Sequence, residues 1–138
     1  MAEPRRVHTM GIQTLEDVLY HGLKDLLSAE KQFRDALPKL AEAANDPELS
    51  EAFSHHQGQT LTQIDRLEEC FELLGRAERS EKCKAAAGLT AEGDSIIDEE
   101  GDAPAKDVML VAAGRKTEHY EIASHEDAWK LDNSLCPT

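Results

Sequence analysis

The chain has 138 residues, of which 40% are hydrophobic and 4% aromatic, and its formal net charge is −13. This length fits one domain, and the scarcity of aromatic residues favours helices over a β-sandwich or barrel. The negative charge argues against binding nucleic-acid phosphates or anionic membrane surfaces. No apolar run is long enough to cross a bilayer and the N-terminus lacks a signal-peptide pattern, so we expect a cytoplasmic protein.

Residues 1–13 show no periodic pattern, and we expect them to form a flexible N-terminal tail. Thr14 precedes two acidic residues, which is typical of a helix start because threonine caps backbone N–H groups and acids complement the helix dipole. The pattern predicts a first helix from this cap to about Ala44. Pro38 lies inside it and is expected to kink the helix or divide it in two.

One face of this first helix is apolar except at Glu30. The residues that recur there at helical spacing are Leu15, Leu19, Leu23, Leu26, Glu30, Phe33, Leu37, Leu40 and Ala44. An isolated carboxylate is costly to bury. The sequence therefore predicts that Glu30 is protonated, paired with another side chain, or bound to a metal ion.

A second helix is predicted from Pro47 to about Leu74, with Asp46 as its N-cap and Gly75 as its natural end. Its inner face is apolar near both ends and polar in the middle. The short turn between the first two helices predicts that they form an antiparallel hairpin.

The polar middle of the second helix is expected to lie level with Glu30. A rise of about 1.5 Å per residue places Glu30 roughly 21 Å from the turn, and Gln59 and Thr60 roughly 19 Å from it. In an antiparallel hairpin, Glu30 would therefore face His56, Gln59 and Thr60.

A third helix is expected from about Glu81 to Asp98, with Glu92 near its inner face as a candidate buried acid. In a hairpin with the fourth helix, the residues level with Glu118 are alanines. The third helix is therefore expected to serve packing or crossover and to supply no ligand.

A fourth helix is predicted from about Pro104 to about Trp129, which makes residues 14–130 one helical domain and 131–138 an irregular C-terminal tail. Four amphipathic helices with short connections predict an all-α antiparallel bundle. The expected inner face of the fourth helix consists of Val108, Val111, Gly114, Glu118, Glu121, His125 and Trp129.

The inner faces together bring five polar side chains toward one level of the bundle: Glu30, His56, Gln59, Glu118 and Glu121. Glu118 and Glu121 lie one turn apart on the same face. Inward carboxylates from facing helices build dinuclear iron or manganese sites, and hard oxygen ligands suit iron, manganese or magnesium. The pattern therefore indicates a metal site.

Each of these side chains also has a purely structural interpretation. A buried Glu30 is more often hydrogen-bonded to a polar neighbour than bound to a metal, and His56 is more often a core or rim histidine. Glu118 and Glu121 are placed to pair with nearby basic residues. The chain also contains no Glu-x-x-His pair, which sites of this type usually show, so both interpretations stay open.

Several segments resemble the YciF-type (YciE/YciF) ferritin-like stress-protein family. The resemblance covers roughly residues 12–124. It rests on TLEDV at 14–18, SAEKQ at 28–32, ALPKL at 36–40, DPEL at 46–49, the His55-His56 pair with Thr60 and Gln63, and EHYEIAS at 118–124. It implies a ferritin-like bundle, often dimeric, in the bacterial cytoplasm and linked to stress responses. It also implies that Glu30, Glu118 and Glu121 are ligands of a di-metal site holding iron or manganese.

The sequence departs from the family pattern at the expected site. Gln59 stands where the family usually carries a glutamate, and His125-Glu126 where a Tyr-Gly pair is usual. The family also continues into a fifth helix that this sequence does not contain. These departures leave the expected site weak, mononuclear, completed by a partner chain, or empty.

Two hypotheses of different classes follow. In the first, the domain binds iron or manganese through Glu30, Glu118 and Glu121, assisted by His56 or Gln59; bound iron would permit oxygen or peroxide chemistry, with turnover left open. In the second, the chain is a non-catalytic helical oligomerisation module, in which a dimer covers apolar faces that lack a fifth helix. A hydrolase or nucleotide-binding enzyme is disfavoured because no glycine-rich phosphate loop or nucleophile motif occurs.

Overall fold

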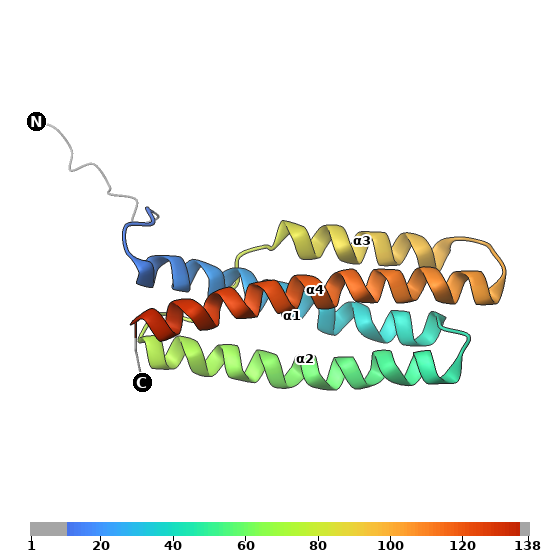
Figure 1. Cartoon of the computed structure of the whole chain (residues 1–138), viewed down its shortest axis with the longest axis horizontal. Helices are drawn as coiled ribbons and strands as arrows, with labels where there is room; N and C mark the ends of the chain where they lie inside the picture. The colour runs from blue at the N-terminus through green and yellow to red at the C-terminus, as the bar shows by residue number, and fades with distance from the viewer. Residues whose placement is uncertain (1–10, 136–138) are drawn as a thin grey trace, which may run out of the picture.

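The computed structural model describes residues 11–135, with side chains as far as Asp132. Within this range the chain forms four α-helices and no strand. The helices are α1 (Leu15–Ala43), α2 (Pro47–Leu74), α3 (Lys84–Asp98) and α4 (Ala103–Leu135). Consecutive helices run antiparallel (Figure 1), which confirms the expected all-α bundle. Of the expected N-terminal tail, residues 1–10 lie outside the described range, and residues 11–13 precede α1 without helical structure.

α1 is the central helix of the bundle, because it packs against each of the other three. Within the described residues, α3 packs against α1 and α4 and does not contact α2. α2 and α4 touch at few positions, so the bundle is least closed between these two helices. Side chains on α1 can therefore meet side chains from both α2 and α4 in the interior.

The start of α1 matches the expected cap. The Thr14 hydroxyl accepts a hydrogen bond from the Asp17 backbone N–H, and the Asp17 carboxylate accepts one from the Thr14 N–H. Pro38 does not divide the helix, which runs on to Ala43. Pro38 has no N–H to give to the carbonyl of Arg34 one turn earlier, and the Gln57 side-chain amide of α2 donates to that carbonyl at 3.4 Å instead. α2 thereby stabilises the point at which α1 lacks a backbone hydrogen bond.

α2 begins and ends where the sequence predicts. Asp46 caps it with Pro47 in the first turn, and Gly75 ends it with φ 71°, a left-handed conformation that glycine adopts without strain. The Asp107 carboxylate of α4 accepts hydrogen bonds from the backbone N–H groups of Asn45 (2.8 Å) and Asp46 (2.9 Å). The turn between α1 and α2 is thus tied to the start of α4.

α3 begins at Lys84, three residues later than expected. Glu81 is held outside the helix because its N–H donates to the Lys24 carbonyl and its carboxylate pairs with Lys24 Nζ at 2.8 Å. Cys83 then caps the helix, with its sulfur accepting from the Ala86 N–H at 3.4 Å. Glu92 is not the buried acid considered from the sequence: its side chain is exposed and lies 3.6 Å from Lys116 Nζ.

The inner face of α4 differs from the expected one by a rotation of the helix. Val108 and Val111 are exposed, whereas Leu110 and Ala113 are buried. Gly114 stays on the inner face and packs against α2, where a Cβ atom on it would lie 3.0 Å from the Phe53 ring. The helix backbone can approach this ring closely only where a residue lacks a side chain.

α4 is also longer than expected. The irregular tail expected for 131–138 is helical as far as Leu135, and residues 136–138 lie outside the described range. Ala128 and Leu131 pack against the apolar cluster near the start of α1, which extends the buried face of α4 beyond Trp129.

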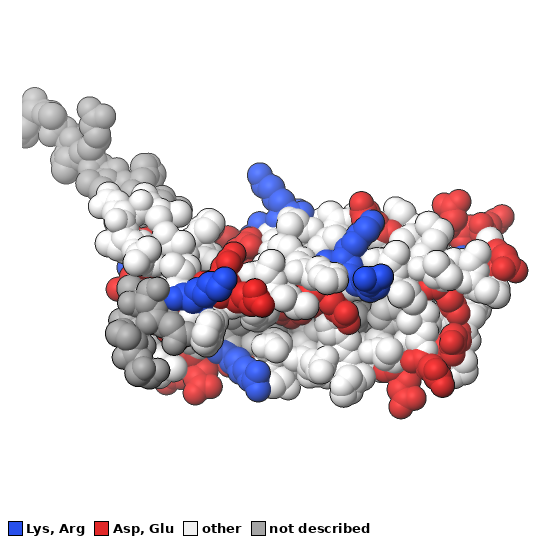
Figure 2. All heavy atoms as spheres, in the orientation of Figure 1, with Lys and Arg blue, Asp and Glu red and all other residues white. Residues whose placement is uncertain are grey.

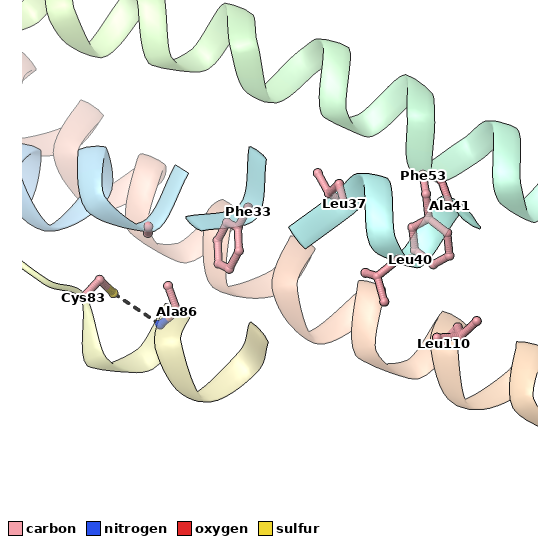
Figure 3. Packing of buried hydrophobic residues seen from close by; sticks show 9 residues of the cluster. Phe33, Leu37, Leu40, Ala41, Phe53, Cys83, Ala86 and Leu110 are labelled. Carbon is pink, nitrogen blue, oxygen red and sulfur yellow. Dashed lines mark hydrogen bonds between the residues drawn. The ribbon is translucent and has the colours of Figure 1, made fainter. Parts of the chain in front are cut away.

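The core consists of two apolar clusters separated by a polar layer. The first cluster joins α1, α2, α3 and α4 and includes the side chains labelled in Figure 3: Phe33, Leu37, Leu40, Ala41, Phe53, Cys83, Ala86 and Leu110. The second lies around the first half of α1 and the second half of α2 and consists of Leu19, Leu23, Leu26, Leu27, Ile64, Leu67 and Phe71. On α2, His56 and Thr60 fall between the two clusters, and on α1, Glu30 lies where they meet, after Leu27 of the second cluster and before Phe33 of the first.

The close approach of Gly114 to Phe53 predicts a selective effect of substitution. Gly114→Val should destabilise the protein by about 1–3 kcal/mol, because the new side chain must displace the ring or push α4 outward. Gly88→Val on α3 is the matched control, since a Cβ atom on Gly88 would meet nothing within 4 Å and the site should tolerate the change. Urea unfolding measures both variants. Equal stability of the two would show that α4 does not present this face to α2.

Candidate metal centre

Glu30 is a fully buried carboxylate in the middle of the bundle, with 0% of the residue exposed. Its Oε1 lies 3.0 Å from Nε2 of His125 on α4. Its Oε2 is buried and has no hydrogen-bond partner among the described residues. Burial in the apolar interior raises the pKa of Glu30 from 4.5 to about 7, with the His125 hydrogen bond opposing the shift and the neighbouring Glu121 carboxylate adding to it.

Glu121 and His125 approach Glu30 from α4. They are four residues apart on one helix, so their side chains project from the same face. One ligand-type atom from each of Glu30, Glu121 and His125 lies within 4.8 Å of the other two. Glu30 and Glu121 are buried and His125 is half-buried, so this group of three donors is largely shielded from water.

His56 of α2 completes the polar layer by contacting Glu121. Its Nε2 lies 2.9 Å from Glu121 Oε1, and its Nδ1 lies 3.8 Å from Glu118 Oε1. The hydrogen bond to Glu121 raises the pKa of His56, with smaller contributions from the charges of Glu118 and Glu30 and an opposing effect of burial. The buried Thr60 hydroxyl donates to the His56 backbone carbonyl at 3.0 Å, which anchors this turn of α2.

The structure brings together some of the side chains that the sequence indicated and separates others. Glu30 and Glu121 lie together, with His56 beside them. Glu118 is on the rim, with 59% of its side chain exposed, because α4 is rotated from the expected orientation. Gln59 is exposed and lines an open groove between α2 and α4 with Gln63 and other residues.

His125 is a member of the cluster that the sequence did not single out. It lies on the expected inner face of the fourth helix, four residues after Glu121, and that i, i+4 spacing is the signal that could have indicated it. The segments that resemble the family end at Ser124, one residue earlier, so the resemblance does not reach His125. In the structure, its Nε2 is the hydrogen-bond partner of Glu30 Oε1.

The donor set fits a divalent metal ion. Two carboxylates near one another in a low-dielectric interior repel unless a proton or cation neutralises them. Oε2 of Glu30 is a buried acceptor for which the described residues offer no hydrogen bond, and such groups are rare unless an ion or water satisfies them. Imidazole and carboxylate together are common ligands for iron, manganese and zinc.

The surface around the bundle is acidic. Figure 2 shows acidic side chains gathered at the end that carries the α1–α2 and α3–α4 connections, in keeping with the net charge of −13. Such a field attracts cations. Within residues 11–135, no helix is both long enough and apolar enough to span a membrane.

The fold and the site together define a class of protein. Its members are helical bundles with carboxylate and histidine side chains in the middle of the bundle, between two apolar clusters. A family model described as a domain of unknown function (DUF892) matches residues 14–131. The chain therefore belongs to this family, which is the one that its sequence segments resemble.

Individual relatives agree with this assignment. Protein YciF of Escherichia coli (strain K12) is 41% identical over 117 residues, spanning 84% of this chain and 70% of the relative. The solved structure of the E. coli stress protein YciF superposes with a TM-score of 0.86 at 39% identity, over 90% of this chain and 79% of the other. YcfI from Rhodopseudomonas palustris, described as a putative structural protein, gives a TM-score of 0.87 at 38% identity, over 92% and 81% of the two chains.

The buried carboxyl predicts how stability of the metal-free protein depends on pH. The pKa of Glu30 is higher in the folded chain than its ordinary value of 4.5, so the folded state holds more protons and stability falls as pH rises from 4.5 through about 7. The raised pKa of His56 acts in the same direction above pH 6.5. Between pH 5 and 8, metal-free protein in chelator should lose stability on the order of 1–3 kcal/mol through Glu30.

Glu30→Gln should lose less stability over this range, because an amide does not titrate. Urea unfolding at a series of pH values measures the difference. Parallel pH profiles for the two proteins would contradict a raised Glu30 pKa.

Proposed function

We propose that this chain is a metal-binding member of its family that holds iron or manganese in the bundle core. The ligands in this proposal are Glu30, Glu121 and His125, with His56 supporting Glu121. The observation that carries the proposal is the fully buried Glu30 carboxylate, whose Oε2 has no partner among the described residues although two further ligand-type side chains lie beside it.

The surroundings of the site favour binding of a cation and allow it to enter. The apolar clusters on either side keep water from the carboxylates, so their attraction for a cation is stronger than at the surface. The groove between α2 and α4, lined by His56, Glu118 and Glu121 among others, offers a path of approach from solvent. A bound iron or manganese ion would supply one-electron chemistry toward oxygen or peroxide. From the kinship with the stress protein YciF, we propose a cytoplasmic role in stress response for this chain.

Metal binding should depend on Glu30. Apo-protein titrated with Mn²⁺, or with Fe²⁺ without oxygen, should reach saturation near stoichiometric metal, and Glu30→Gln should bind at least about 100-fold more weakly because a buried anionic ligand is lost. Glu92→Gln, which changes an exposed acid on α3, is the control and should bind like the unaltered protein. A metal content below about 0.1 per chain at saturating metal would refute the proposal.

A second candidate function is assembly of the bundle into a dimer, and a specific surface favours it. Val111, Ile122 and Trp129 on α4 are exposed to 41%, 54% and 66%. Their spacings of 11 and 7 residues are close to three and two helical turns, so they share one face. Ile122 also lines the groove between α2 and α4, where the bundle is least closed. We propose that a second copy of the chain covers this face.

Dimerisation is testable by one substitution on that face. The unaltered protein should sediment as a dimer at micromolar concentration with or without metal, and Ile122→Glu should shift it to monomer because a charge would be buried. Leu73→Glu on the outer side of α2, where the leucine is 81% exposed, should leave the dimer intact. A wild-type monomer in dilute solution would contradict this second function.

A further inference from the structure

We infer that the core site takes a single divalent transition-metal ion per chain, ligated by Glu30, Glu121 and His125, and that it does not hold a pair of ions. This inference rests on the proposed metal binding and gives its stoichiometry and ligands. It departs from the two-metal site that the family resemblance implies.

The number of ligands is the first argument. Bundles that hold two metal ions use a glutamate from each of two helices and a Glu-x-x-His pair from each of the other two, which makes four carboxylates and two imidazoles for two ions. The set per ion is therefore two carboxylates and one imidazole. Glu30, Glu121 and His125 supply that set once.

The other helices do not supply a second set among the described residues. On α2, Gln59 is neutral and exposed on the groove. On α3, the residue buried against the core at this end of the helix is Ala86, which has no ligand atom on its side chain. Glu118 of α4 has 59% of its side chain in solvent and lies beside His56 Nδ1.

Charge balance is the second argument. Ionised Glu30 and Glu121 carry two negative charges, which one divalent ion neutralises. A second divalent ion would add two positive charges for which the described residues offer no further buried carboxylate, and burying unpaired charge is strongly unfavourable. The buried carboxylates therefore set the capacity of the site at one ion.

His56 has a different role from His125. It lies 2.9 Å from Glu121 and is not one of the three residues whose ligand atoms are mutually within 4.8 Å. A histidine that hydrogen-bonds a ligating carboxylate orients it, and losing such a partner typically weakens metal binding about 10–100-fold. His125 also lies 3.0 Å from a carboxylate oxygen, but its ligand atom belongs to the group of three donors. His125 is therefore the nitrogen ligand, and His56 is a positioning residue.

The imidazole ligand also narrows the class of metal. Mg²⁺ and Ca²⁺ prefer sites made entirely of oxygen, whereas imidazole suits first-row transition metals. Mn²⁺ and Fe²⁺ should therefore bind in the presence of excess Mg²⁺.

Stoichiometry and spectroscopy of the Mn²⁺-loaded full chain test the inference. Equilibrium dialysis should saturate at one Mn²⁺ per chain, and pulsed EPR should detect the modulation from one coordinated imidazole nitrogen. His125→Gln should weaken binding at least about tenfold and remove the nitrogen modulation at saturating Mn²⁺. His56→Gln should weaken binding about 10–100-fold and keep the modulation. His119→Gln, which changes an exposed histidine of α4, should alter neither the affinity for Mn²⁺ nor the nitrogen modulation.

The possible outcomes distinguish failure of the single-ion site from failure of the proposed metal binding. Two ions per chain, or nitrogen modulation that survives His125→Gln and disappears in His56→Gln, would overturn the single-ion site and leave metal binding intact. Absence of Mn²⁺ and Fe²⁺ binding by the unaltered chain would instead overturn the proposed function. The wild-type stoichiometry decides the number of ions even where a variant does not fold.

Discussion

The neutralisation of one buried carboxylate is the constraint on which the rest of this structure depends. Glu30 lies on α1, the helix that contacts all the others, and none of its surface reaches solvent. A charge in that position is unfavourable unless a proton, a partner or a cation compensates it. The fold provides His125 for one carboxylate oxygen, and the described residues leave the other without a partner. The polar layer between the two apolar clusters follows from this requirement.

The same constraint explains how α2 and α4 share the site. α2 contributes a histidine and a threonine where the rest of its inner face is apolar, and the threonine holds the backbone of the histidine. α4 contributes Glu121 and His125, which reach the interior because Gly114 lets the helix approach Phe53 closely. The opening between α2 and α4 remains next to these residues, so the surface proposed for a second copy of the chain adjoins the proposed metal site.

Local signals in the sequence predicted most of the fold. Thr14, Asp46, Pro47 and Gly75 act through backbone hydrogen bonds or a left-handed φ angle within a few residues, so their effects can be read without the tertiary structure. The predicted start of α3 was wrong because Glu81 bonds to Lys24, a partner 57 residues away. The predicted end of α4 was wrong because packing of Ala128 and Leu131 against the second apolar cluster determines it.

The candidate site was predictable in part for the same reason. The apolar neighbours of Glu30 made its burial evident, and the rise along a helix placed His56 at its level. The sequence could not predict the rotation of α4, because two adjacent faces of this helix are equally apolar. One face carries Val108 and Val111, and the other carries Leu110 and Ala113. That rotation moves Glu118 to the rim, whereas His125, which is already on the expected inner face, lies beside Glu30. The segments that resemble the family end at Ser124, so they did not include His125, the nitrogen ligand in our proposal.

The most direct test of this account is a crystal structure of Mn²⁺-soaked protein with anomalous data collected on both sides of the manganese absorption edge. The account predicts one anomalous peak per chain, within coordination distance of Glu30 Oε2, Glu121 and His125. Two peaks in the core would contradict the single-ion site. No peak beside Glu30 at saturating Mn²⁺ would contradict the central claim that this carboxylate is buried to hold a metal.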